Sequence, residues 1–329
     1  MFSYSVKFQQ ALYHTAILAA TALTTIFLWV YFRMPESSLQ IVVFAFFTAI
    51  KISDFASFVV RLKILAKMLI GAVILQYTIS VTANFHLLNA FLPAMICFII
   101  LKKLSIGAAY PVLLTGLQTY SATPGALAAA ERSVDLLIAG ATAWVITSLA
   151  AVPKKQLKTN ASSDPILTTY EAFIKALTVF CAIFLYHILS IPQGIWIILT
   201  VIFLYLVQSP EKRSIDLACQ RIIAVPAGII LGGIYSSSAV IFDYRLAYLA
   251  PLVGTAGFFI LFYFNDFFSF SLLFLFAFTV YADWGNGTFR EFNFQQLLFA
   301  RSLATAIGAG TLLIIEKSSA GVPSKISST

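Results

Sequence analysis

The sequence predicts an all-helical, polytopic membrane protein with about twelve transmembrane helices in two parallel six-helix repeats. Three observations lead to this fold class. Hydrophobic residues make up 60% of the 329 residues, charged residues make up only 10%, and the mean hydropathy is +0.92, whereas soluble domains are about 45–50% apolar and about 25% charged. The apolar residues form runs of helix length between short polar segments. Finally, similar residues recur at similar positions in the two halves of the chain.

The apolar runs are long enough for membrane helices, because a span needs about 20 residues, and fewer where a helix is tilted or broken. The first run is longer than the apolar part of a secretion signal and is followed by many more, so we expect it to be retained. In chain order, the predicted helices cover residues 11–32, 38–52, 64–82, 86–101, 105–121, 133–152, 170–190, 194–208, 221–239, 246–263, 267–282 and 299–316.

The basic residues are distributed unevenly over the two sides of this arrangement. If the N-terminus is cytoplasmic, 16 of the 21 Lys and Arg residues lie on the cytoplasmic side. Membrane proteins carry this excess on cytoplasmic loops, so both termini are expected in the cytoplasm. Topology therefore explains the net charge of +8 better than a nucleic-acid partner does.

Residues recur between the halves at a nearly constant offset, which predicts an internal repeat. The offset grows to 169 residues between Arg132 and Arg301, because the second half has a longer polar segment before its last helix. An even number of spans in each unit makes the repeats parallel, related by an axis along the membrane normal. The matched pairs at offsets of 157, 157 and 158 residues are Pro35 with Pro192, Gly71 with Gly228, and Pro93 with Pro251.

Four regions follow from these boundaries. Residues 1–153 form the first six-helix repeat and residues 170–317 the second. Residues 154–169 are polar and form a cytoplasmic linker. Residues 318–329 form a short cytoplasmic tail.

No motif for enzymatic chemistry or for a cofactor is present. The three cysteines and three histidines are scattered, and the sequence has no CxxC, HExxH, Walker or GxGxxG motif. We therefore expect no enzymatic activity, no cofactor, no metal site and no nucleic-acid partner.

One arginine lies at the start of the sixth predicted helix of each half. The two segments are AERSVDLLIAGATAW and ARSLATAIGAG. A charge at this depth is costly unless it is paired, faces a cavity or reaches the interface. The planar guanidinium groups of Arg132 and Arg301 suit a carboxylate. They form either an anion-binding ring or interfacial anchors. Asp135 lies one turn after Arg132 on the same helix face, as its ion-pair partner or as a proton carrier.

Arg221 and five glycines are further candidates for functional or helix-packing roles, chosen by their positions in the predicted helices. Arg221 lies at the cytoplasmic end of its predicted helix, where it marks topology or attracts a cytosolic anion. Small residues at a spacing of four allow membrane helices to approach closely. The glycines expected at such helix contacts are Gly71, Gly228, Gly232, Gly308 and Gly310.

The segment PQGIWIILTVIFLYLVQSPEKRSIDLACQRIIAVPAGIILGG, residues 192–233, resembles the fusaric-acid-resistance and aromatic-acid-exporter superfamily. The sixth helix also fits that family, because Arg301 is followed by Gly308 seven residues on. The first half fits less well, since Gly140 lies eight residues after Arg132 and no Trp occupies residues 38–52. The residues that carry the resemblance are Trp196, Thr200, Gln220, Arg221, Gly228 and Gly232.

The resemblance implies a transporter in the bacterial inner membrane that exports small organic, often aromatic, acids together with a periplasmic adaptor. Many relatives carry a cytosolic domain after each membrane block, for which this chain has only the 16-residue linker and a short tail. An adaptor would dock on the outer loop around Asp283 to Gln296. A second copy of the chain and membrane lipid are further expected partners.

Together, these observations predict an exporter of small organic anions, either aromatic carboxylic acids or a carboxylate siderophore. The substrate would enter near Arg221, pass between the repeats and leave past Arg132 and Arg301, with Trp196 and Thr200 as further binding residues. Two alternatives stay open. The six-helix pattern also resembles plant malate channels, which implies a passive anion channel. A non-transporting membrane scaffold is the third reading, although the two-repeat pattern favours transport.

Overall fold

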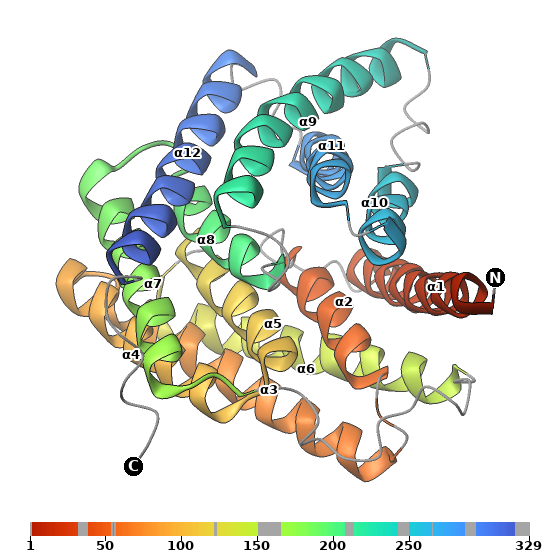
Figure 1. Ribbon diagram of the computed structural model, residues 1–329, viewed down its shortest axis with the longest axis horizontal. Helices are drawn as coiled ribbons and strands as arrows, with labels where there is room; N and C mark the ends of the chain where they lie inside the picture. Colours follow the sequence, from red (N-terminus) through yellow and green to blue (C-terminus); the bar gives the residue numbers. More distant parts are fainter. Residues whose placement is uncertain are drawn as a thin grey trace.

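The structure is a computed structural model that describes residues 2–31, 39–53, 55, 57–121, 124–150, 166–207, 214–242, 250–264, 266–286 and 294–319. The regular elements in these ranges are helices (Figure 1), so the prediction of an all-helical chain is confirmed. The helices up to residue 150 are α1 (Phe2–Tyr31), α2 (Leu39–Ser53), α3 (Phe58–Thr82), α4 (His86–Lys103), α5 (Ile106–Leu117), the 3₁₀-helix η2 (Gln118–Ser121) and α6 (Ala126–Leu149).

The second half of the chain contributes six further α-helices to the described part. They are α7 (Thr169–Leu189), α8 (Ile195–Val207), α9 (Ser214–Phe242), α10 (Ala250–Phe264), α11 (Phe267–Asn286) and α12 (Phe294–Ser319).

Each predicted helical segment coincides with one of these α-helices, but several helices begin earlier than their apolar runs. α3 begins at Phe58, α6 at Ala126 and α9 at Ser214. Hydropathy marks only the apolar part of a helix, whereas good helix formers such as the alanines of ALAAAERS extend it by further turns.

Five helices of the described part are long and apolar enough to cross a membrane, judged by length and composition. They are α4, α6, α7, residues 214–235 of α9 and residues 298–319 of α12. An all-helical chain with five candidate membrane-spanning helices is consistent with a helical membrane protein.

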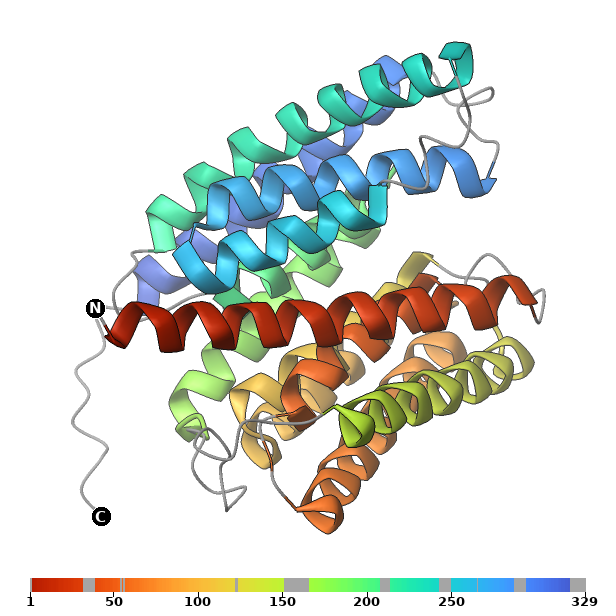
Figure 2. The same cartoon turned by 90° about the vertical axis from the view of Figure 1, so that its right-hand side faces the viewer.

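The two halves have corresponding helix contacts. In the first half, α6 packs against α1, α2 and α3, and α12 packs against the corresponding helices α7, α8 and α9 in the second half. Likewise, α5 packs against α3 and α4, and α11 packs against α9 and α10. The halves meet where α4 packs against α7, α1 against α10, and α5 against α8. Figure 2 shows α1 lying between the helices of the first half and α9 to α12.

The core of the molecule lies around two short helices. Every residue of α5 from Ala108 to Leu117 is buried, and so is every residue of α8 from Ile195 to Tyr205. The outer helices α3, α4 and α7 instead expose large apolar side chains, as expected for surfaces that face lipid. The functional candidates of the second half therefore lie on or against a helix that is enclosed by protein.

Two predicted regions fall largely outside the described residues. Of the linker 154–169, only residues 166–169 are described, and α7 begins at Thr169 with a capping box between Thr168 and Glu171. Of the tail 318–329, only residues 318 and 319 are described. The outer loop predicted around Asp283 to Gln296 is shorter than expected, because α11 continues to Asn286 and α12 begins at Phe294.

Candidate functional site

Arg221 is the largest fully buried side chain of the described part. It lies two turns into α9, and its exposed fraction is 0%. Its guanidinium carbon lies 4.7 Å from the ring centroid of Phe203 on α8, and its Nη1 donates a hydrogen bond of 3.3 Å to Ser271 Oγ on α11. Three helices thus enclose one cation.

The guanidinium of Arg221 is only partly satisfied. Its Nε and Nη2 atoms are buried and have no hydrogen-bond partner within the described ranges, and no carboxylate of those ranges contacts it. Removing a charge from water costs on the order of several kcal/mol unless partners compensate. A cation–π contact returns only about 2 kcal/mol when desolvated. An anion bound beside the Arg221 guanidinium would therefore offset part of its desolvation cost.

Arg301 is held by the same helix α8 from another side. It lies on α12 and is 5% exposed, with its guanidinium carbon 5.1 Å from the ring of Trp196. Its Nε donates to Gln193 Oε1 at 3.5 Å. Gln193 belongs to the short α7–α8 connection and has a φ of 61°, a left-handed conformation. The turn itself thus places the Gln193 amide beside Arg301.

The face of α8 between these arginines carries one polar group. Trp196, Thr200 and Phe203 follow at spacings of four and three, which places them on one side of the helix. From Trp196 to Phe203 the helix rises by about 10 Å. The hydroxyl of Thr200 is buried without a hydrogen-bond partner in the described part of the chain, and so is that of Thr305 on α12. This face of α8 therefore presents two aromatic rings and one hydroxyl, and the arginines of α9 and α12 lie against the two rings.

Glycines allow the neighbouring helices to approach this face. A Cβ atom on Gly308 would lie 2.5 Å from the carbonyl oxygen of Ile197. The backbone of α8 therefore occupies the space that a side chain at position 308 of α12 would need. Gly228 and Gly232 of α9 make similar approaches to α11, and Gly71 of α3 to Val112 of α5. These contacts agree with the predicted helix packing.

Gly310 corrects that prediction. A Cβ atom there would meet no described atom within 4 Å. Two residues after Gly308 on α12, the helix has turned by about 200°, so Gly310 points away from α8. The predicted small face therefore comprises Gly308 without Gly310.

In the first half, Arg132 of α6 has conventional partners. It is 5% exposed, and its Nη2 donates a hydrogen bond of 2.9 Å to Ser80 Oγ on α3. Asp135 lies buried one turn later, and the charges of Asp135 and Glu131 stabilise the arginine electrostatically. The hydrogen bond of Arg132 to Ser80 lies within the first half and the contacts of Arg301 with Gln193 and Trp196 lie within the second, so the expected ring stays a prediction.

Arg61 was missed as a buried residue, because the sequence suggested only a cytoplasmic positive charge. It lies on α3, is 7% exposed, and donates from Nε to Phe55 O at 2.6 Å and from Nη1 to Thr147 O at 2.7 Å. Thr147 is 86 residues away in the chain. No local pattern could reveal this contact. Phe203 was missed for a different reason, since it looks like any other apolar residue of α8.

A histidine pair joins the halves at one end of α4 and α7. His86 Nδ1 and His187 Nδ1 lie 3.1 Å apart, and His187 Nε2 lies 2.8 Å from Asn89 Oδ1. The Asn89 amide is oriented by its Nδ2, which donates to Ile79 O and Thr82 Oγ1. His187 must then donate from Nε2, so in its neutral form its bare Nδ1 accepts a hydrogen bond from His86 Nδ1–H. Two of the three scattered histidines thus meet only in the fold.

Two tyrosines extend this cluster. Tyr120 of η2 donates to the carbonyl oxygen of Asn89, and Tyr186 of α7 donates to the carbonyl oxygen of Tyr120 at 3.1 Å. The cluster ties α3, α4, η2 and α7 together, and within the described residues it is not part of a group of three or more metal-ligating side chains.

No protein-family model, curated protein or solved structure matches this chain. The functional assignment therefore depends on the geometry of the site.

Proposed function

We propose that this protein is an exporter of small organic anions in the bacterial inner membrane and that its anion site lies at Arg221. The observation that carries the proposal is the fully buried guanidinium with two nitrogen atoms that lack partners among the described residues. Its fork geometry suits a carboxylate, which would accept two parallel hydrogen bonds and neutralise the charge.

The surroundings of Arg221 favour a carboxylate attached to an aromatic or other flat group. The Phe203 ring lies against the guanidinium and the Trp196 ring lies further along the same face of α8. Aromatic side chains hold flat rings by stacking or edge contacts. An anion would move from Arg221 past Thr200 to Arg301, a step of about 10 Å along the helix. Aromatic carboxylates and carboxylate siderophores are the substrate class that this path suits.

The arrangement of helices supports two repeats with twelve membrane segments. The packing of α6 on α1, α2 and α3 corresponds to that of α12 on α7, α8 and α9. Between the halves, α4 packs against α7 and α10 packs against α1. These two contacts correspond, because α10 is the counterpart of α4 and α1 is the counterpart of α7. Parallel repeats of this kind are related by an axis along the membrane normal.

The short central helices also fit a carrier. α5 has 12 residues before η2, and the described part of α8 has 13, so these segments rise about 18–20 Å, compared with about 30 Å for the hydrocarbon core. Helices of partial depth are tolerated where protein surrounds them, and transporters place their substrate sites at such helices. If α1 begins in the cytoplasm, Arg221 lies toward the inner side and Arg301 toward the outer side.

The test is anion flux through the purified protein. Metabolite profiles of cells with and without the protein would first identify the exported carboxylate. Proteoliposomes would then measure its efflux for wild type, Arg221→Met, Arg221→Lys and the exposed control Lys63→Met. We expect at least about thirtyfold loss for Arg221→Met, because a buried charged hydrogen-bond partner is worth 2 kcal/mol or more. Arg221→Lys should lose less, and Lys63→Met should match wild type.

Each other result has a clear meaning. Wild-type flux in Arg221→Met would contradict the proposed site. Unitary currents in bilayers would indicate a channel, whereas saturable exchange without unitary conductance indicates a carrier. No flux of any carboxylate by the wild type would leave the scaffold alternative.

A further inference from the structure

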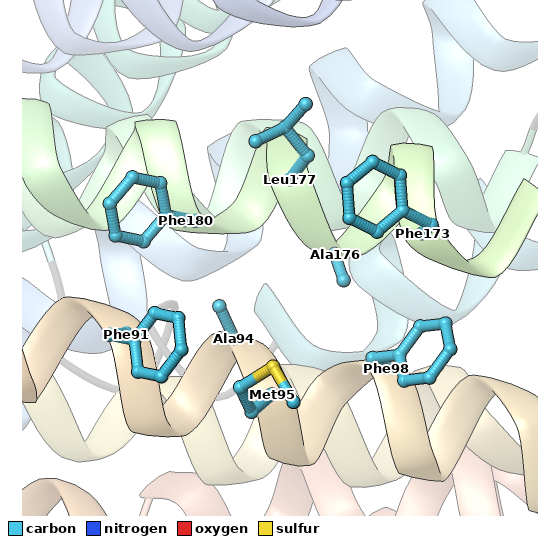
Figure 3. Close-up of a pocket in the computed structure, with 8 residues that line it drawn as sticks. All are labelled: Phe91, Ala94, Met95, Phe98, Phe173, Ala176, Leu177 and Phe180. Carbon is cyan, nitrogen blue, oxygen red and sulfur yellow. The ribbon is translucent and has the colours of Figure 1, made fainter. Parts of the chain in front are cut away.

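A groove with only apolar side chains runs between α4 and α7. Its volume is about 400 Å³, and it is lined by Phe91, Ala94, Met95, Phe98, Phe173, Ala176, Leu177 and Phe180. Figure 3 shows Phe91 opposite Phe180 at one end and Phe98 near Phe173 at the other, with the two small alanines between them. We call this feature the α4–α7 groove. Its lining offers no group that could hold a carboxylate, so it differs in chemistry from the Arg221 site.

The groove opens to the outside of the helix bundle. Phe91 and Phe173 are 50% and 54% exposed, whereas Ala94 and Ala176 on its floor are each 6% exposed. An apolar hollow of this kind on a membrane protein faces the acyl chains of the bilayer. The small alanines create the hollow, because larger side chains at both positions would fill it.

Basic residues stand at one end of the α4–α7 groove. Lys102, one turn after Phe98 on the same side of α4, donates from Nζ to Leu167 O at 3.3 Å and so bridges to the residues before α7. Lys103 is exposed beside it. Glu171 lies at this end, and its carboxylate accepts hydrogen bonds of 2.8 Å from Thr168 N and Oγ1. Lys175, one turn later on α7, interacts with Glu171 and with Glu316. Among these described residues, three cations and two anions leave a net positive charge.

The length of the groove matches one leaflet. From Phe91 to Lys102, α4 rises by about 16 Å, and half of the hydrocarbon core is about 15 Å thick. A chain anchored at the lysines would therefore reach through the groove to about the middle of the membrane.

We propose that the α4–α7 groove binds one acyl chain of an anionic phospholipid whose headgroup phosphate lies at Lys102 and Lys103. Basic residues where membrane helices end select anionic headgroups, and the excess of basic residues places this end on the cytoplasmic leaflet. Because α4 and α7 belong to different halves of the chain, the lipid joins the halves from outside. The assignment does not depend on the transported substrate.

The test counts the lipids that stay bound to the purified protein. The protein in detergent is mixed with equal amounts of palmitoyl-oleoyl phosphatidylglycerol and phosphatidylcholine and is examined by native mass spectrometry. One variant removes the charge, Lys102→Gln with Lys103→Gln. Another fills the groove, Ala94→Leu with Ala176→Leu. Matched controls on other surfaces are Lys63→Gln with Lys67→Gln on α3, and Ala141→Leu on α6, all at exposed positions.

We expect the wild type to retain phosphatidylglycerol in preference to phosphatidylcholine. The lysine variant should lose this preference by about fivefold per lysine, and the filled variant should lose the bound lipid with its lysines intact. Both controls should behave as wild type. Lys102 is half-buried and Lys103 is exposed, so the lysine variant leaves the apolar helix contacts in place and tests the proposal even where the filled variant does not fold.

Three results would overturn the assignment. Equal retention of the two lipids by the wild type would exclude a headgroup site. An unchanged preference in the lysine variant would place the headgroup elsewhere. Crosslinking between introduced cysteines at Met95 of two chains, reduced by neither lipid, would show that a second copy covers the groove.

Discussion

The buried arginines of the two halves are stabilised in different ways. In the first half, Arg61 donates to two backbone carbonyls and Arg132 to Ser80 beside Asp135. In the second half, Arg221 donates one hydrogen bond to Ser271 and Arg301 one to Gln193, and each guanidinium also lies near the ring of an aromatic residue of α8. Carbonyl and carboxylate oxygens satisfy a guanidinium permanently, whereas a ring face leaves the edge N–H groups for another acceptor.

This contrast separates structural cations from a candidate site. A buried charge that donates hydrogen bonds to backbone carbonyls of other segments stabilises the packing of its helices, and removing it leaves those carbonyls without donors. A buried charge with partners missing lowers stability until an anion arrives. Arg61 represents the first kind and Arg221 the second. Residue type and burial alone would not have distinguished them.

The largest expected effect comes from removing each arginine in turn. Arg61→Met should lower the free energy of unfolding by about 3 kcal/mol, because the carbonyls of Phe55 and Thr147 lose their donors. Arg221→Met should leave stability unchanged or raise it, since an apolar side chain of similar length replaces an uncompensated charge. Denaturation of both variants in detergent measures the difference. If Arg221→Met is as damaging as Arg61→Met, Arg221 is structural and the contrast fails.

A smaller effect is expected from closing the α8–α12 contact. Gly308→Ala places a Cβ against the Ile197 carbonyl and should cost about 2 kcal/mol by forcing the helices apart. Anion flux should fall as well, because Arg301 and Trp196 lie on the same two helices. Gly310→Ala is the matched control, since a Cβ atom there would meet no described atom within 4 Å. It should raise stability by up to about 1 kcal/mol through helix propensity. Equal effects of the two substitutions in the same assays would show that close packing at Gly308 does not matter.

The smallest expected effect concerns the hydrogen bond of Arg132. Ser80→Ala removes one acceptor at 2.9 Å while Asp135 stays in place, so stability should fall by about 1 kcal/mol. Flux should be unchanged, because Arg132 serves the packing of α3 and α6. Thermal unfolding and proteoliposome efflux of the same variant check both statements. A collapse of flux without loss of stability would instead make Arg132 part of the anion path.

Part of the candidate site could be predicted from residue spacing. Trp196 and Thr200 lie on one helix face, and Gly308 follows Arg301 by two turns, so short-range periodicity placed each group correctly on its own helix. The expected ring of Arg132 and Arg301 is different in kind, because it needs two helices of different halves to come together. The histidine pair shows the same limit, since His86 and His187 are 101 residues apart and meet through α4–α7 packing.

The sequence by itself determined the helical membrane class, the order of the helices and the positions of the charged residues near their ends. These properties depend on local hydrophobicity and on backbone hydrogen bonds within each segment, which a membrane makes obligatory. Only the tertiary structure decided which buried arginine is satisfied. Arg61 and Arg221 are both basic residues in the first turns of long helices. Their different surroundings arise from side chains and carbonyls on other helices, whose approach is set by packing across the whole bundle.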